Sequence, residues 1–250
     1  MDKKIALLID AENVSSKYIK YLTPELAKYG TATYKRIYGD WTDSKAESWK
    51  KVLLEQAITP IQQYSYTTGK NSSDSAMIID AMDILYSDSV DGFCIVSSDS
   101  DFTKLALRLR EAGKYVIGMG ERKTPLAFRN ACEKFVFLEV LLPDNKPQAK
   151  PAVKPQGKKE EHCETNQVFD KDVVIKAIRD IIDDLSDESG WAYLGDIFNN
   201  LNKQYPEFDS RIFGFRKSSD FIKSLKDHFV TEARSSKGQG SPDTMYVKIK

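Results

Sequence analysis

Short apolar segments alternate with longer amphipathic segments through the first 142 residues, and this alternation restricts the fold more than any other feature of the sequence. The apolar segments, which we expect to be strands, are 4–9, 32–38, 60–65, 92–97, 114–119 and 135–138. Helical patterns fall between them, near 15–29, 43–57, 74–87, 101–112 and 125–132. Because strands that alternate with helices form right-handed crossovers, we expect an α/β fold with a mainly parallel central sheet covered on both faces.

A proline-rich segment at 143–167 separates this region from the rest of the chain. It holds four of the nine prolines and almost no large apolar residue, which is typical of a linker. We therefore expect two domains, at 1–142 and 168–250.

The region 168–250 has a different pattern. Apolar positions at helical spacing predict three helices, within 171–185, 190–205 and 218–229, with Ser218 or Ser219 as the N-cap of the third. Alternating residues at 229–233 and 245–250 then predict two paired strands. Three helices followed by a hairpin indicate a small α+β domain of the winged-helix type.

Four aspartates fall where ligands bind in an open parallel sheet, beyond the carboxyl ends of the strands. Asp10 ends the first strand, Asp99 and Asp101 follow the fourth, and Asp74 opens the helix before the fourth. Carboxylates that converge in this way repel one another, and hard cations that prefer oxygen ligands relieve that repulsion. The sequence therefore predicts a site for Mg²⁺ or Mn²⁺ at this edge.

Helix capping is the alternative explanation for two of these acids. Asp74 and Asp101 each lie where a side chain can accept from the free N–H groups at the start of a helix. Capping explains one acid at a time, whereas a metal site explains why three separate segments deliver acids to one edge. Two further acids follow on the helix of Asp74: Asp80 is a candidate supporting residue, and Asp83 is expected on a solvated face.

Neutral and basic residues expected at the same edge suit a phosphate group. The candidates for contacting substrate are Asn13, Lys70, Ser97, Ser98, Arg122 and Lys123. No nucleophilic triad accompanies them, because the only histidines, His162 and His228, lie in the linker and in the second region. A metal held by carboxylates can instead activate water against a phosphorus atom, and this chemistry leads to phosphodiester hydrolysis.

Charge and cysteine usage limit the other classes of function. The 37 basic and 37 acidic residues give a formal net charge of zero, so nucleic-acid binding must depend on local patches. No apolar run approaches the roughly 18 residues of a membrane span, and the run after Lys4 is too short for a signal peptide. Cys94, Cys132 and Cys163 match no disulfide or zinc pattern. We expect a cytoplasmic protein with reduced thiols and no membrane partner.

Two stretches and their spacing resemble a known family. "ALLIDAEN" and "GKNSSDSAMIIDAMDILYSDSVDGFCIVSSDSDFTKLALRLREAGKYVIGMGERKTP" are similar to the NYN domain in its LabA-like branch, over roughly residues 3–140. That family resembles PIN-domain nucleases. The resemblance implies a PIN-like three-layer fold and a magnesium- or manganese-dependent ribonuclease. It also implies that Asp10, Asp74, Asp99 and Asp101 are the metal-binding and catalytic acids, with Asn13 beside the first.

The second region resembles the OST-HTH domain, also called LOTUS, through "WAYLGDIFNNLNKQYPEFDSRIFGFRKSSDFIKSLKDHFVTEA". This resemblance implies a winged helix that binds RNA, which we expect to be single-stranded, or a protein partner. Residues 203–250 carry 10 basic and 6 acidic side chains, a surplus of four positive charges that could follow phosphates. The candidate RNA-binding residues are Arg216, Lys217, Lys223, Lys226, Arg234 and Lys237.

Two other functions remain open at the level of sequence. "DSDFT" at 99–103 imitates the DxDxT nucleophile motif of haloacid-dehalogenase phosphatases, although that family begins its fold with this strand. The second alternative is a non-catalytic RNA-binding or scaffold protein whose acidic site is vestigial.

Overall fold

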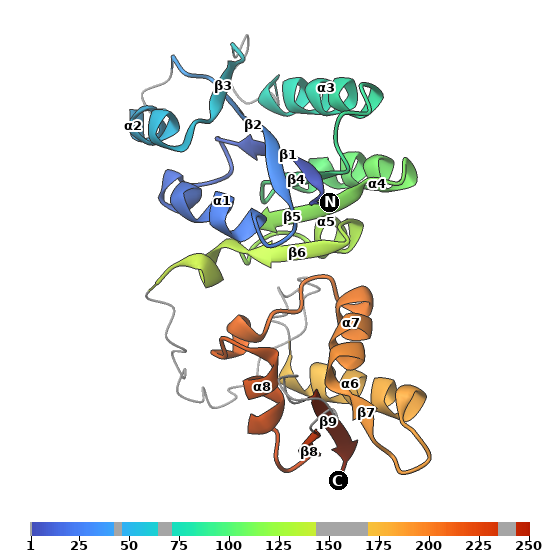
Figure 1. Ribbon diagram of the computed structural model, residues 1–250. Coiled ribbons are helices and arrows are strands. Elements are labelled where there is room, and N and C mark those ends of the chain that lie inside the picture. Colours follow the sequence, from blue (N-terminus) through green and yellow to red (C-terminus); the bar gives the residue numbers. More distant parts are fainter. Residues whose placement is uncertain (1, 43–46, 65–71, 144–169, 235–243) are drawn as a thin grey trace, which may run out of the picture. The chain divides into compact units, whose positions relative to one another are not determined.

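The chain divides into two compact units, Met1–Pro143 and Asp144–Lys250, each of which is described here by itself (Figure 1). The computed structural model describes residues 2–42, 47–64, 72–143, 170–234 and 244–250. Apart from Pro143, the segment expected to be the linker therefore lies outside the described residues, as do Lys70 and Lys237.

The first unit is built on a six-stranded sheet in which every pair of neighbouring strands is parallel. Its strands are β1 (Lys4–Asp10), β2 (Thr31–Gly39), β3 (Thr59–Gln62), β4 (Gly92–Val96), β5 (Tyr115–Gly120) and β6 (Lys134–Phe137). They lie in the order β3-β2-β1-β4-β5-β6. The apolar runs of β1 and β4 form the two central strands, where both faces are buried.

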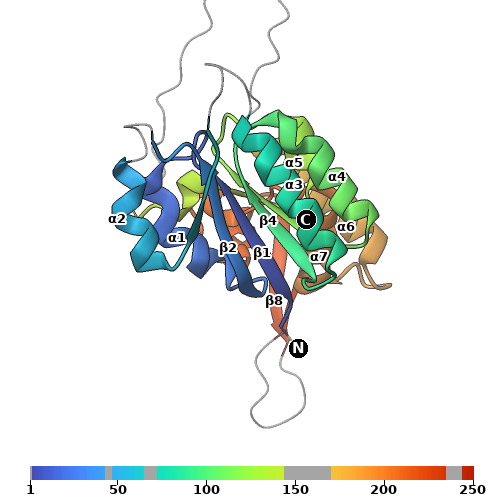
Figure 2. The same cartoon turned by 90° about the horizontal axis from the view of Figure 1, so that it is seen from above.

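Helices cover both faces of this sheet, which confirms the predicted three-layer α/β fold (Figure 2). On one side lie α1 (Ile19–Leu26) and α2 (Glu47–Gln56), and on the other lie α3 (Ser72–Tyr86), α4 (Thr103–Glu111) and α5 (Leu126–Ala131). Short 3-10 turns, η1 (Ser16–Tyr18), η3 (Ser100–Phe102) and η4 (Leu138–Leu141), complete the connections.

The strand order creates a switch point between β1 and β4. From β1 the chain proceeds to β2 and β3 on one side, and from β4 it proceeds to β5 and β6 on the other. The connections leaving the carboxyl ends of β1 and β4 therefore diverge, and this is where open α/β sheets bind ligands. Asp10 ends β1, and Ser97, Ser98 and Asp99 directly follow β4 at the same point.

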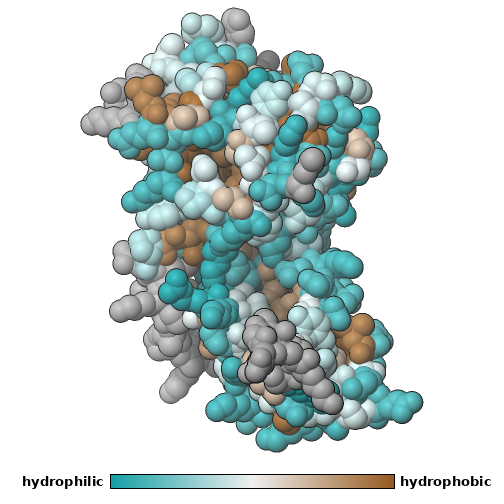
Figure 3. Space-filling model, viewed as in Figure 1, coloured by the Kyte–Doolittle hydropathy of each residue, from teal (hydrophilic) through white to brown (hydrophobic). Residues whose placement is uncertain are grey.

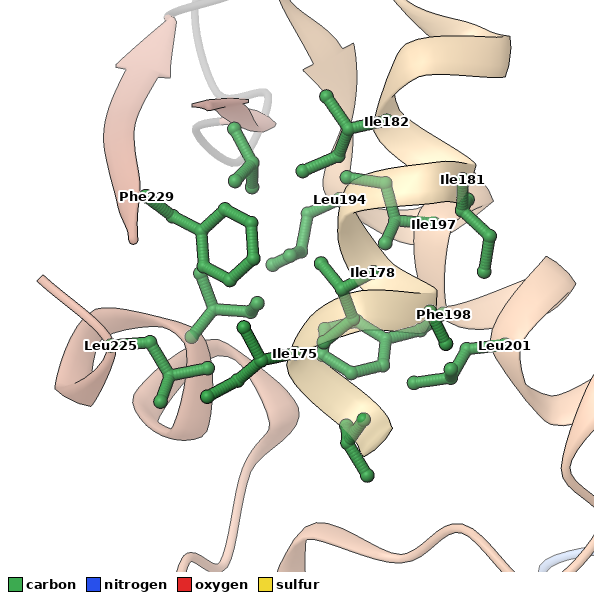
Figure 4. Close-up of a cluster of buried hydrophobic side chains, with 14 of the residues drawn as sticks. Ile175, Ile178, Ile181, Ile182, Leu194, Ile197, Phe198, Leu201, Leu225 and Phe229 are labelled. Carbon is green, nitrogen blue, oxygen red and sulfur yellow. The ribbon is translucent and has the colours of Figure 1, made fainter. Parts of the chain in front are cut away.

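The second unit packs helices against a small antiparallel sheet. Its elements are α6 (Lys171–Leu185), β7 (Ala192–Tyr193), α7 (Leu194–Gln204), η5 (Ser210–Phe213), α8 (Ser218–Ser224), β8 (Phe229–Arg234) and β9 (Thr244–Ile249), with strand order β7-β9-β8. Ile178 of α6, Ile197 of α7 and Phe229 of β8 meet in one apolar core (Figure 4). This arrangement confirms the predicted small α+β domain.

Two local predictions for the second unit are wrong. Helix α8 begins directly at Ser218, and its N-cap is Lys217, whose side chain makes no capping hydrogen bond, so neither Ser218 nor Ser219 is the cap. The same helix ends at Ser224, earlier than predicted, and a turn leads into β8. Phe229, at the end of the predicted helix, is the first residue of β8, and its side chain lies in the apolar core.

The described surface is mainly hydrophilic on the face seen in Figure 3, with hydrophobic residues exposed in small separate groups. Within the described ranges, no helix combines the length and apolar character that crossing a membrane requires.

Candidate functional site

Asp10 is the most constrained acid at the switch point. Its Oδ1 accepts hydrogen bonds from the backbone N–H groups of Glu12 at 3.0 Å and Asn13 at 3.2 Å. Its Oδ2 accepts from the Asn13 side-chain amide at 2.8 Å and from the Ser97 hydroxyl at 2.7 Å. Only 1% of the residue is exposed. Four donors thus fix this buried carboxylate in one orientation.

Ser97 connects the ends of the two central strands. Its hydroxyl donates to Asp10 at the end of β1 and accepts from the backbone N–H of Asp99 at 3.0 Å. Ser98 makes the next link, because its hydroxyl accepts from the backbone N–H of Glu121 just beyond β5. These two buried serines therefore connect the carboxyl ends of β1, β4 and β5 at the site.

Three further acids gather beside this support. Asp74, Asp99 and Asp101 each offer a carboxylate oxygen, and these oxygens lie within 4.8 Å of one another. Asp74 comes from the first turn of α3, whereas Asp99 and Asp101 come from the turn after β4. Asp74 is 7% exposed, Asp99 is half-buried and Asp101 is exposed, so the cluster extends from the interior to the solvent.

The electrostatics of the cluster are unfavourable without a cation. The pKa of Asp74 is raised from 3.8 to about 7, first by burial and then by the negative charges of Asp10, Asp99, Glu12 and Asp101. A raised carboxyl pKa means that the ionised form is destabilised in the folded protein. The cluster would therefore gain free energy from a positively charged ligand.

The structure revises the capping explanation. Asp99, rather than Asp101, caps the turn at Ser100–Phe102, because its Oδ1 accepts from the backbone N–H of Asp101 at 2.9 Å. Asp74 lies inside the first turn of α3, which begins at Ser72. The capping bond uses one oxygen of Asp99 and leaves its other oxygen available to the cluster.

The two remaining acids of α3 have different surroundings. Asp80 forms an ion pair with Arg36 and accepts a hydrogen bond from the Tyr38 hydroxyl, and both partners belong to β2. Tyr38 is the register partner of Asp10, so Asp80 anchors α3 to the strand beside the site. Asp83 is exposed.

The residues predicted to contact substrate fall into three groups. Asn13, Ser97 and Ser98 lie at the switch point but are engaged in the hydrogen bonds described above. Arg122 and Lys123 are exposed beyond β5, where Lys123 forms an ion pair with Glu121 at 3.0 Å. Lys70 lies outside the described residues.

Sequence reasoning missed two residues here. Glu12 is exposed, and its negative charge contributes to the raised pKa of Asp74. The sequence could have indicated it, because it follows Asp10 by two residues beyond the carboxyl end of the same strand. Ser73 precedes Asp74 and is 2% exposed, and its hydroxyl has no hydrogen-bond partner in the structure as described. No sequence pattern distinguishes such a serine from an ordinary helix-start residue.

The structure separates the basic residues predicted to bind RNA. Arg216, Lys217, Lys223 and Lys226 are exposed in and around α8. Arg234 instead ends β8, and its guanidinium lies over two aromatic rings, Trp191 and Tyr246.

Comparisons with known proteins support two domain types. Residues 4–139 match the NYN domain, and residues 170–240 match the OST-HTH/LOTUS domain, which confirms the resemblance of the two regions to these two domains. No curated protein matches the chain.

Two solved structures resemble part of the chain. A protein of unknown function from Vibrio parahaemolyticus is 21% identical, with a TM-score of 0.46, over 54% of this chain and 91% of its own. An uncharacterized protein from Nitrosomonas europaea is 33% identical, with a TM-score of 0.27, over 44% of this chain and 92% of its own.

Proposed function

The chain belongs to the NYN domain family, and from this premise we propose that it is a metal-dependent ribonuclease that hydrolyses RNA phosphodiesters. NYN domains are typically nucleases, and nucleases of this PIN-like type generally use divalent metals. In this proposal Asp10, Asp74, Asp99 and Asp101 are the metal-binding and catalytic acids.

The convergence of Asp74, Asp99 and Asp101 is the observation that carries the proposal. Two segments of the chain bring three carboxylates within 4.8 Å, and burial together with the neighbouring acids raises the pKa of Asp74, the most buried of the three. Hard oxygen donors in this arrangement fit Mg²⁺ or Mn²⁺. A divalent cation bound there would polarise a phosphate oxygen, activate water and neutralise developing charge.

The residues of the site would have different roles around the divalent cation. Asp74, Asp99 and Asp101 would hold the cation through carboxylate oxygens that lie within 4.8 Å of one another. Asp10 would be the fourth metal-binding acid and would act from a fixed position, since Asn13 and Ser97 restrain its orientation. Arg122 and Lys123 beyond β5, together with Lys70, would contact phosphates of the bound strand.

The second unit supplies RNA binding in this proposal. OST-HTH/LOTUS domains bind RNA, and residues 170–240 match that domain. The exposed cations Arg216, Lys217, Lys223 and Lys226 are candidates for phosphate contacts near α8, where they would release counterions. We propose that the second unit captures single-stranded RNA and that the first unit cuts it.

Cleavage of labelled single-stranded RNA with Mn²⁺, with and without a chelator, tests the proposal. The parent protein should cleave only with metal, and Asp99→Asn should lose most of this activity while still binding RNA. Asp83→Asn is the matched control, because it removes an exposed acid from α3 outside the cluster. If Asp83→Asn and Asp99→Asn cleave equally well, the acidic cluster is not the active site.

The same assay distinguishes the alternatives. RNA binding without cleavage would favour a non-catalytic RNA-binding protein, a reading supported by the saturation of Asp10 with four protein donors. Release of phosphate from small esters would favour a phosphatase. Against a phosphatase, three strands precede the strand that carries "DSDFT", and one oxygen of Asp99 is used in capping.

A further inference from the structure

The sheet of the second unit has a face that does not contribute to the apolar core. Along the central strand β9, Val247 is buried and Met245 and Ile249 pack against the core. Because side chains alternate along a strand, Tyr246 and Lys248 must point to the opposite face. Their register partners on the neighbouring strands, including Tyr193 on β7 and Glu232 on β8, share that face.

Aromatic rings and a guanidinium group form a row on this outer face. The ring centroids of Tyr193 and Tyr246 are 6.0 Å apart. The guanidinium of Arg234 lies 4.5 Å from the Tyr246 centroid and 5.1 Å from the Trp191 centroid. We call Trp191, Tyr193, Arg234 and Tyr246 the aromatic platform. Tyr193 is 44% exposed, and the other three members are half-buried.

Hydrogen bonds hold the cationic part of the platform in place. Glu232 Oε2 accepts from two nitrogens of Arg234, at 3.3 and 3.2 Å, and this fixes the plane of the guanidinium. Asp187 Oδ1 accepts from the backbone N–H of Trp191 at 3.0 Å, and the Asp187 N–H donates back to the Trp191 carbonyl. Trp191 is therefore positioned by the turn that precedes it.

The Tyr193 ring lies against Gly195, in the space that a side chain there would fill. A Cβ at Gly195 would lie 2.6 Å from Tyr193 Cε1, so any other residue would displace the ring. Lys248 adds a second cation to the same face, where its Nζ donates to the Ser189 carbonyl at 2.8 Å. The rings and cations are thus held in place without a ligand.

We propose that the aromatic platform binds unpaired bases of single-stranded RNA by stacking. Flat π-faces next to an ordered guanidinium suit bases, because bases stack on aromatic rings and on arginine. Arg234 and Lys248 lie where the phosphates of such a strand can reach them. The inference depends on the proposed RNA-binding function, and it adds the binding surface and the mode of recognition. Protein docking on the same face is the competing outcome of the test below.

Binding of two oligomers by the full chain in the presence of chelator tests the platform. One is oligoadenylate of about 12 nucleotides, which suits a single small domain. The other is an abasic oligomer with the same number of phosphates. The parent should bind oligoadenylate roughly tenfold more tightly, since stacking on aromatic side chains needs bases. Equal affinities for the two oligomers would overturn the platform, because phosphates alone would then account for binding.

Substitutions at Tyr193 separate ring stacking from folding. Tyr193→Phe keeps the ring and should bind oligoadenylate as the parent does. Tyr193→Leu should lower the affinity for oligoadenylate several-fold and leave the affinity for the abasic oligomer unchanged. Arg234→Lys keeps the charge but loses the planar group, so it should also lower the affinity for oligoadenylate more than the affinity for the abasic oligomer. Tyr86→Ala, at an exposed tyrosine of α3, is the matched control and should change neither affinity.

Tryptophan fluorescence gives a second measurement. Oligoadenylate should quench the parent's emission, and Trp191→Phe should remove that quenching, although Trp41 and Trp49 remain. Tight oligoadenylate binding with no effect of any platform substitution overturns this inference alone and leaves the face available to a protein partner. A parent that binds neither oligomer overturns the proposed RNA-binding function as well.

Discussion

Two aspartates of helix α3, Asp80 and Asp74, lie in opposite electrostatic environments. Asp80 lies between a cation and a hydroxyl group of β2, Arg36 and Tyr38, so its negative charge is compensated within the protein. Asp74, near the start of the same helix, has its pKa raised to about 7 by burial and by the other acids around it. The difference indicates that Asp80 serves stability, and it makes Asp74 the candidate for binding a cation.

Neutralising Asp74 should have the largest effect on the metal-free protein. Because the pKa of Asp74 is raised to about 7, the folded state binds more protons than the unfolded state between pH about 4 and 7. Stability should therefore fall as the pH rises through this window, by up to about 4 kcal/mol. Asp74→Asn should remove the fall and raise the melting temperature at pH 8, measured by thermal unfolding in chelator.

Added Mn²⁺ provides the control for that prediction. Metal that binds only the folded state stabilises it, so the parent's melting temperature should rise with Mn²⁺ while that of Asp74→Asn should change little. If the melting temperature of the parent changes with neither pH nor Mn²⁺, the repulsion among the acids at this edge does not affect stability.

The same chemical change at Asp80 should have the opposite sign. Asp80→Asn leaves Arg36 without its countercharge, and the two side chains are only 30% and 20% exposed. We expect a loss of about 2 kcal/mol in the free energy of unfolding, reduced from the value of a fully buried pair by partial exposure. Urea titration at pH 7 measures it. Asp88→Asn, which alters the exposed partner of Lys114, should have a smaller effect. If Asp80→Asn stabilises the protein as Asp74→Asn does, the contrast between the two aspartates fails.

Ser97 connects the supporting network to the acidic cluster, so its removal should affect both. Ser97→Ala takes away a donor to Asp10 and the acceptor for the Asp99 N–H, in a position that is fully buried. We expect a loss of about 1–2 kcal/mol in stability, together with slower metal-dependent RNA cleavage. Ser89→Ala alters a hydroxyl far from the switch point and should leave cleavage unchanged. Loss of stability with unaltered cleavage would mean that Ser97 supports the fold only.

The placement of Asp10 and Asp99 could be predicted because it depends on strand ends alone. An apolar run fixes a buried parallel strand, and the residue after it must emerge at the carboxyl edge. The partners of Asp80 could not be predicted, because they come from β2, and no local pattern records that contact. The two-residue strand β7 was missed for a similar reason, since it exists only through pairing with β9 at the far end of the chain. The wrong N-cap at Ser218 shows that residue preference does not fix the first turn of a short helix.

Ser73 should give the smallest effect and the sharpest test of what surrounds Asp74. Its hydroxyl is buried without a hydrogen-bond partner in the described structure, so it carries a desolvation penalty that nothing in the described residues offsets. Ser73→Ala should therefore stabilise the metal-free protein by about 1 kcal/mol or less, measured by urea titration in chelator. The substitution changes no charge, so the pH dependence ascribed to Asp74 should be preserved. Destabilisation by Ser73→Ala would mean that the hydroxyl does have a partner in solution. The buried polar groups around Asp74 would then have more hydrogen bonds than the structure shows.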